Sequence, residues 1–130
     1  MSKFDLYEQI EHIKEYAEAI LKDTDDIQEE EFRSNRLLQR SLTLDIITLG
    51  EIAAVISLKF PDFVKNNKTL PWKDMAAMRH KMVHGYYTID LAIVWDTVKQ
   101  DIPRVLESIP QLRKDVIYFN ERNLDENLER

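Results

Sequence analysis

The amino-acid sequence predicts an all-α protein, folded as an up-and-down bundle of four or five helices. Apolar residues recur at spacings of three and four along almost the whole chain, which is the period of an amphipathic helix. The 130 residues include 2 Gly and 4 Pro, too few for the many turns of a β-sandwich. A chain of this length has the size of one domain and can bury one ordinary core.

Two helices are predicted in the first half of the chain. The first is amphipathic and spans about residues 4–21, and Thr24 or Asp25 is expected to cap the element that follows. The second spans about residues 27–60, with a break expected near residues 34–35.

Proline residues divide the second half. Pro61 is expected to end the second helix, and a loop is expected over residues 62–70. Pro71 suits the first turn of a third helix, because its missing N–H would have no intrahelical partner there. That helix is predicted from Trp72 to about His84, with Gly85 at its C-terminal cap.

The fourth helix has the clearest pattern. One apolar stripe runs from Leu91 to Ile109, and Thr88 or Asp90 is the expected cap. Pro103 lies inside this helix and predicts a kink, because its ring removes one hydrogen bond and clashes with the preceding turn.

The apolar pattern changes after Pro110, where a mixed segment leads into a polar tail, residues 121–130. We therefore expect residues 1–110 to form the helical bundle. Residues 111–130 are expected to form a C-terminal extension that is partly helical or flexible.

Composition and charge exclude several classes of function. Lys and Arg total 18 against 24 Asp and Glu, a net charge of −6, so the surface should on average repel nucleic acid and anionic lipid. Any RNA contact then needs a local basic patch. The absence of cysteine excludes disulfides, cysteine zinc sites, iron–sulfur clusters and thiol nucleophiles, and favours a cytoplasmic location. No apolar run is expected to reach the roughly 20 residues of a membrane span, so we expect no membrane association.

The residues best suited to catalysis are concentrated in residues 78–87. This segment holds Arg79, His80, Lys81 and His84, together with two tyrosines. An imidazole, with a pKa of about 6.5, can accept and return a proton near neutral pH. The fork of donors on Arg matches phosphate oxygens. An Arg beside a His therefore suits cleavage of a phosphodiester, because one stabilises charge on phosphorus and the other moves the proton.

Other interpretations of this segment stay open. His80 and His84 also fit a polar stripe on a helix surface. They match the spacing of two zinc ligands, but the metalloprotease pattern needs Glu directly after the first His, where this chain has Lys81. Geometry raises an objection to the catalytic interpretation, because Arg79 and His84 lie roughly 140° apart on an ideal helix. Either the helix ends before His84, or a second copy of the chain completes the site.

The segment resembles a known family. Arg79, four intervening residues, His84, Gly85 and Tyr86 resemble the R-x4-H-x-Y motif of HepT-like toxins, which belong to the HEPN superfamily of helical ribonucleases. His80 takes the polar position after the Arg, where Asn is commoner in that family. The resemblance covers about residues 4–109 and includes Gly50-Glu51, Trp72, Ile89-Asp90, Trp95 and Asp101-Ile102-Pro103.

This resemblance implies a homodimeric bundle that sets two copies of the motif around one cleft. Arg79 and His84 would cut an RNA substrate without a metal or a cofactor, leaving a cyclic phosphate. The resemblance also implies a partner, a minimal nucleotidyltransferase antitoxin that adds AMP to Tyr86. Negative phosphates near Arg79 would fill the place of an RNA phosphate and repel the substrate.

Each residue of the motif has an expected role in this hypothesis. His84 is the general base or acid, and Arg79 is the phosphate clamp. His80 is a supporting donor, and Lys81 is a further phosphate contact. Glu51 is expected to pair with Arg79 or to orient a histidine, with a solvated helix residue as the alternative.

Two features of the predicted second helix have both a functional and an ordinary interpretation. A glycine inside a helix lowers its stability by about 1 kcal/mol relative to Ala. Gly50 therefore indicates the close approach of another helix or protomer, and the ordinary interpretation is a glycine that the helix tolerates. Arg33, Arg36 and Arg40 form a basic stripe that would guide RNA, although such stripes are usually solvated faces.

Two other functions remain as alternatives to a ribonuclease. The first is a non-catalytic dimeric helical module that binds a nucleotidyltransferase partner or presents a site to it. The second is a purely structural bundle.

Overall fold

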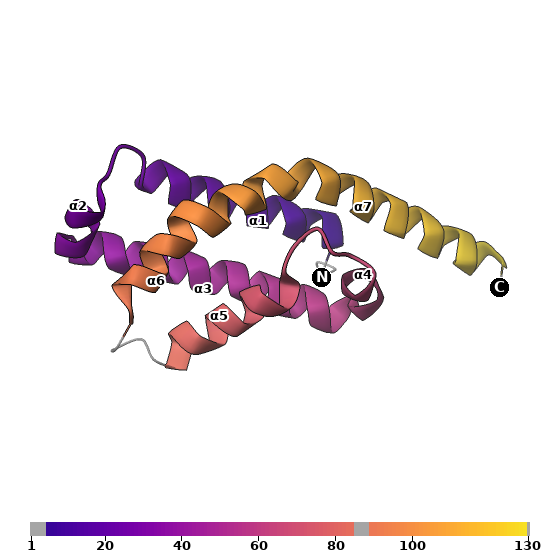
Figure 1. Cartoon of the computed structure of the whole chain (residues 1–130). Helices are drawn as coiled ribbons and strands as arrows, with labels where there is room; N and C mark the ends of the chain where they lie inside the picture. The colour runs from indigo at the N-terminus through magenta and orange to yellow at the C-terminus, as the bar shows by residue number, and fades with distance from the viewer. Residues whose placement is uncertain (1–4, 85–88, 130) are drawn as a thin grey trace.

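The computed structural model describes residues 5–84 and 89–129, with the backbone alone for residues 84 and 125–129. All regular structure in these residues is helical, which confirms the predicted all-α class. The four long helices are α1 (Leu6–Asp23), α3 (Arg36–Lys59), α5 (Trp72–His84) and α7 (Ile102–Glu129). They run alternately up and down the bundle (Figure 1).

Polar side chains set both ends of α1. The Asp5 carboxylate accepts a hydrogen bond from the backbone N–H of Tyr7 at 2.9 Å, which caps the N-terminus. The Thr24 hydroxyl donates to the Ile20 carbonyl at 2.8 Å and is buried where α1 ends. Our prediction that Thr24 or its neighbour caps the next helix is therefore wrong, because the cap residue of that helix is Gln28.

The predicted break in the second helical stretch is confirmed. A short helix α2 (Glu29–Ser34) is followed by Asn35, whose side chain accepts from the Leu38 N–H at 3.0 Å and caps α3. The Gln39 amide donates to the Phe32 carbonyl at 2.9 Å and so satisfies the end of α2. Each helix thus has a cap at the break.

The segment between α3 and α5 is more ordered than the predicted loop. Its first residues form a short helix, α4 (Pro61–Lys65), in which proline takes the first position. The Asn67 amide and the Thr69 hydroxyl both donate to the Asp115 carboxylate, at 2.7 and 2.9 Å. Trp72 donates its indole N–H to Asn67 at 3.3 Å, so α7 fixes this segment and the start of α5.

The fourth predicted helix begins as α6 (Leu91–Asp96). The Asp90 carboxylate caps it by accepting from the Ala92 N–H at 2.9 Å, which confirms one of the two predicted caps. Trp95 is buried in this helix and stacks on Phe32, with ring centroids 5.1 Å apart.

The distortion expected near Pro103 takes the form of a π-helical turn, η2 (Thr97–Asp101). The Ile102 N–H donates to the Thr97 carbonyl, five residues earlier. Pro103 has no N–H for the carbonyl of Lys99, and its ring would crowd that carbonyl in an α-helix. The wider π turn relieves this conflict, and the α6–α7 segment is visibly curved (Figure 1).

Helix α7 continues through Pro110, so the segment that we expected to be partly helical or flexible is helical as far as Glu129. Leu112 and Val116 are fully buried in the same core as the rest of the bundle. Arg113 donates from Nε and Nη2 to the two carboxylate oxygens of Glu11 on α1, at 2.6 and 2.8 Å. These hydrogen bonds lower the pKa of the Glu11 carboxyl, so it stays ionised and paired.

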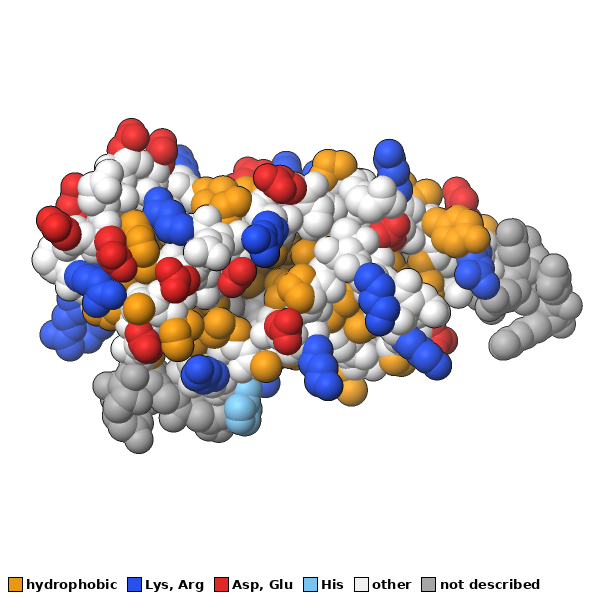
Figure 2. Space-filling model, in the orientation of Figure 1, with side chains coloured by type: hydrophobic (Ala, Val, Ile, Leu, Met, Phe, Trp, Pro, Cys, Tyr) orange, Lys and Arg blue, Asp and Glu red, His pale blue; other side chains and the backbone are white. Residues whose placement is uncertain are grey.

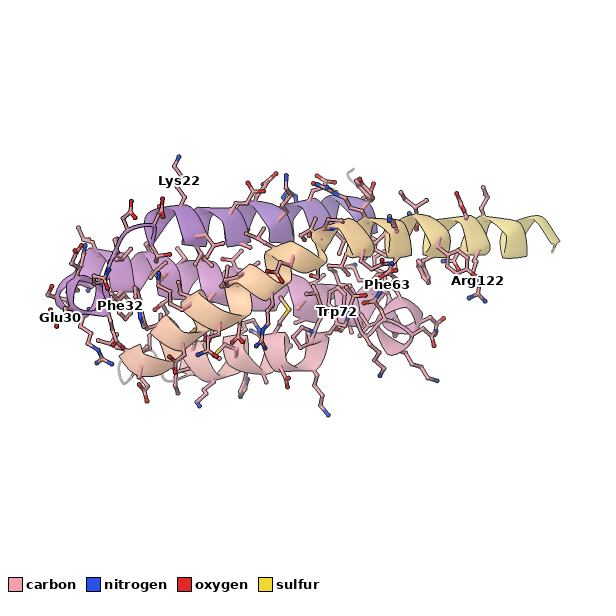
Figure 3. The ribbon with its side chains drawn as sticks, turned by 45° about the horizontal axis from the view of Figure 1, so that its top comes forward. Lys22, Glu30, Phe32, Phe63, Trp72 and Arg122 are labelled. Atoms are coloured by element: carbon pink, nitrogen blue, oxygen red, sulfur yellow. The ribbon has the colours of Figure 1, made fainter. Side chains whose placement is uncertain are left out.

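The core lies between α1, α3, α5 and α7. Helix α3 packs against both α1 and α5, and α1 packs against α7. Aromatic rings close the end of the bundle near α4, where Phe63 and Trp72 lie close together (Figure 3), with centroids 5.9 Å apart. Phe119 of α7 reaches the same cluster, with its ring centroid 5.4 Å from that of Phe63.

Helix α3 contains the most apolar stretch of the chain. In length and composition it would suffice to cross a membrane, contrary to our expectation from the sequence. In the structure its inner face belongs to the core between α1 and α5, with Leu42, Leu49 and Ile56 almost completely buried. A core helix of a bundle meets the same criterion, so this feature is weak evidence for a membrane span.

Candidate active site

Helix α5 carries Arg79 and His84, the predicted catalytic residues, and its bounds agree with the predicted helix over residues 72–84. It lies along α3, and the two helices make the most extensive contact in the bundle. The predicted cap residue Gly85 and the modification site Tyr86 fall outside the described residues.

Helices α3 and α5 approach each other closely at Gly50. A Cβ atom built on Gly50 would lie 2.5 Å from Cβ of Arg79 and 2.6 Å from the backbone oxygen of Met75. Both distances are shorter than any real carbon contact, so no larger residue fits without moving α5. The close approach that we inferred from Gly50 is therefore made by α5 of the same chain.

Arg79 is held against α3 by an ion pair with Glu51. Its Nε lies 3.3 Å from a carboxylate oxygen of Glu51. The Nε atom is buried and has no hydrogen-bond partner among the described residues, so its contact with Glu51 is an ion pair rather than a hydrogen bond. Of the roles considered for Glu51, the structure supports pairing with Arg79.

Part of the Arg79 side chain remains accessible. The side chain keeps 30% of its surface exposed, and that of Glu51 keeps 55%. Arg79 is therefore anchored at one edge and still reachable from solvent, which is the arrangement needed to bind an anion.

The other motif residues lie around the same helix. His80 and Lys81 are exposed on α5. The backbone of His84 is the last residue of α5, and its side chain is not described. The helix includes His84, so it does not end before this residue as one of our two explanations required. The Cα–Cβ bonds of Arg79 and His84 therefore point in directions roughly 140° apart around the helix axis.

The three basic residues near the start of α3 do not form one continuous stripe. Arg33 belongs to α2 and pairs with Glu29, with 3.4 Å between nitrogen and oxygen. The break at Asn35 separates it from Arg36 and Arg40, which are exposed on α3. The expected basic stripe is thus reduced to two arginines.

Among the side chains of residues 5–83 and 89–124, no group of three or more His, Asp or Glu is placed to hold an ion.

Comparison with known proteins identifies the family. Residues 6–112 match the HepT-like family, described as "Ribonuclease HepT-like". This chain belongs to the HepT-like family. A "Probable ribonuclease HepT" of Thermococcus cleftensis is 33% identical over 105 residues, which is 81% of this chain and 93% of the relative.

Two proteins of Methanocaldococcus jannaschii, each named a putative RNase, are similar to this HepT-like chain. One is 29% identical over 109 residues, covering 84% of this chain and 97% of the relative. The other is 32% identical over 111 residues, covering 85% and 86%. No solved structure matches the chain significantly.

The HepT-like match includes Gly50, Glu51 and the whole of α5, and it ends inside α7. The pairing of Glu51 with Arg79 could not be chosen from spacing alone, because it joins two helices. The signal available in the sequence was Gly50, a costly residue inside an apolar helix directly before the acidic partner.

We predict that Gly50→Ala lowers the free energy of unfolding by about 1–2 kcal/mol. The added Cβ overpacks the contact between α3 and α5, and this costs more free energy than the higher helix propensity of Ala contributes. Urea unfolding followed by circular dichroism measures this. Ser41→Ala at an exposed position of α3 is the matched control and should change stability by less than about 0.5 kcal/mol. A Gly50→Ala protein as stable as the parent would contradict the role given to this contact.

Proposed function

We propose that this protein is a metal-independent endoribonuclease that acts as a homodimer in the cytoplasm. In this proposal it is the toxin of a HEPN/nucleotidyltransferase toxin–antitoxin pair. One observation carries the proposal: Arg79 is anchored by Glu51, stays partly exposed, and precedes His84 by five residues on one helix. The ribonuclease names of the family and of its relatives support RNA as the substrate.

The proposed reaction is an internal transfer at phosphorus. The 2′-oxygen of the RNA forms a bond to phosphorus, and the bond from phosphorus to the 5′-oxygen of the next nucleotide breaks. His84 takes the proton of the 2′-hydroxyl as general base or gives one to the 5′-oxygen as general acid. Arg79 binds the phosphate oxygens, on which negative charge increases in the transition state. The products are a cyclic phosphate and a free 5′-hydroxyl.

Glu51 acts in this proposal as a positioning residue. Its carboxylate holds the Nε edge of Arg79 at 3.3 Å, so the guanidinium has little freedom before substrate binds. His80 and Lys81, both exposed on α5, supply a further donor and a positive charge for the RNA backbone. Arg79 and Lys81 provide the local positive charge that a chain of net charge −6 requires to bind RNA.

Dimerisation is supported by an exposed stripe on α3. Leu37, Leu44, Glu51 and Leu58 follow one another at intervals of seven residues, so they share one face of the helix. The three leucines are 78%, 63% and 80% exposed, which is unusual for large apolar residues. A second copy packed on this face would cover them and bring both Glu51–Arg79 pairs to the interface. The two chains would then supply complementary groups to one cleft.

The strongest alternative is a non-catalytic dimeric module that presents Tyr86 to a nucleotidyltransferase. It needs the same dimer and the same Tyr86, but no chemistry at His84. Cleavage of RNA by the protein before AMP is added to Tyr86 would distinguish the ribonuclease from this alternative.

We predict that the purified protein cleaves single-stranded RNA in the presence of EDTA, and that His84→Ala lowers the rate by about 10²–10⁴-fold through loss of acid–base catalysis. A gel assay of a labelled RNA measures it. His12→Ala is the matched control, because His12 lies on α1 beside Glu8 and Glu15, and it should keep full activity. Equal activity of the two variants would remove the assignment of His84.

We predict that the protein sediments as a dimer and that Leu44→Glu weakens the dimer by about tenfold or more, because a charge would be buried in an apolar interface. Leu124→Glu introduces the same change at an exposed leucine of α7 and should leave the mass unchanged. A parent protein that is monomeric at all concentrations would exclude the shared cleft.

We predict that incubation with a minimal nucleotidyltransferase and ATP adds AMP to Tyr86 and stops RNA cleavage, because the added phosphates repel the substrate near Arg79. Mass spectrometry of tryptic peptides locates the modification. Tyr86→Phe should block the inhibition, whereas Tyr87→Phe should not. Modification of a chain that has no activity beforehand would favour the non-catalytic module.

A further inference from the structure

A hollow lies beside α5, next to the contact of this helix with Gly50. It is a cavity of about 380 Å³ between α3, α5, the turn η2 and the start of α7. Arg79, His80 and Lys81 do not line it. Figure 2 shows hydrophobic side chains between α5 and the α6–α7 segment, with charged side chains beside them.

The floor of this cavity is apolar, and its size suits a small molecule. The volume lies within the range of about 300–1,000 Å³ that is typical of ligand sites. Two methionines of α5 form one wall, and methionine adapts easily to the shape of a ligand. The apolar lining includes Leu49, Leu70, Met75, Met78, Ile102 and Val105.

The rim carries three charged groups from three elements. Asp74 comes from α5, Asp101 from η2 and Arg104 from α7, and all three are exposed. The side chains of these three residues make no hydrogen bond or ion pair with another described residue. Two carboxylates and one guanidinium give the rim a formal charge of −1.

The two hydroxyls at the cavity are already used. Thr97 donates to the Ile93 carbonyl at 2.8 Å, and Thr69 donates to Asp115 at 2.9 Å. The three charged side chains are therefore the polar groups left to select a ligand, and the two carboxylates outnumber the one guanidinium. Asp101 lies at the end of the π-helical turn, a kind of distortion that is frequent at functional sites.

We propose that this cavity binds a small organic cation, namely an aromatic or branched aliphatic amine. Its apolar body would lie against Met75 and Met78, and its ammonium group would lie at the carboxylates of Asp74 and Asp101. Charge complementarity with the rim selects a cation over an anion or a neutral molecule of the same shape.

The cavity also adjoins the contact that places Arg79. Met75 lines the cavity, and its backbone oxygen belongs to the close contact with Gly50. A ligand here would touch the helix that carries Arg79. The binding proposal itself does not rest on ribonuclease activity, because it is tested without RNA.

Three probes with the same phenyl body test the proposal: 2-phenylethylamine, 2-phenylethanol and phenylacetate. Each is titrated into the full ¹⁵N-labelled chain, and backbone amide shifts are followed. We expect the amine to shift the signals of Asp74, Met75 and Asp101, and to bind about tenfold more tightly than the alcohol. The anion should bind most weakly.

Substitutions at the rim give effects of opposite sign. Asp74→Asn and Asp101→Asn should each weaken amine binding by about fivefold, and Arg104→Gln should tighten it by a similar factor, as expected for single charges near a surface. Asp96→Asn is the matched control, because Asp96 is exposed on α6 but does not line the cavity. Circular dichroism confirms that each variant is folded.

Three results would overturn the proposal. They are equal binding of the amine and the alcohol, shifts confined to residues outside the cavity, and a loss of binding in Arg104→Gln. The first would mean that the cavity takes apolar groups without regard to charge. The second would place the amine elsewhere on the protein.

Discussion

The contact of α3 with α5 at Gly50 is the constraint on which the site depends. The absence of a Cβ lets the backbone of α5 come so close that a methyl group there would lie 2.5 Å from Cβ of Arg79. The next residue, Glu51, then lies within 3.3 Å of the Arg79 guanidinium. One residue sets the separation of the helices and its neighbour supplies the charge, so the position of the arginine follows from the packing of the bundle.

Helix α7 extends this control to the beginning of α5. Asp115 accepts hydrogen bonds from Asn67 and Thr69, and Asn67 in turn accepts the indole N–H of Trp72, the first residue of α5. Arg113 donates hydrogen bonds to both carboxylate oxygens of Glu11 and so fixes α7 on α1. The α7 residues that make these interactions, Arg113 and Asp115, lie beyond residue 112, where the family match ends. The C-terminal helix of this chain therefore helps to hold a motif that it does not contain.

The success of each sequence prediction depended on how local its cause was. The limits of α5 were predicted because Pro71 and the apolar pattern act within one turn of the helix. The conformation after Pro110 was left open between helix and flexible chain, because it depends on the burial of Leu112 and Val116 against distant parts of the core, which outweighs the loss of one hydrogen bond. The basic stripe was likewise interrupted by the cap at Asn35, which redirects the chain between Arg33 and Arg36.

By itself the sequence determined the helical class and the position of the motif on one helix. These properties follow from residue type and spacing along the chain. Only the tertiary structure decided that Glu51 is the partner of Arg79, that Gly50 marks a close contact and that α5 makes it, and that three charges with no partner among the described side chains lie at an apolar cavity beside α5. The physical reason is that each of these features joins residues of different helices, and the packing of whole side chains sets the distance between helices.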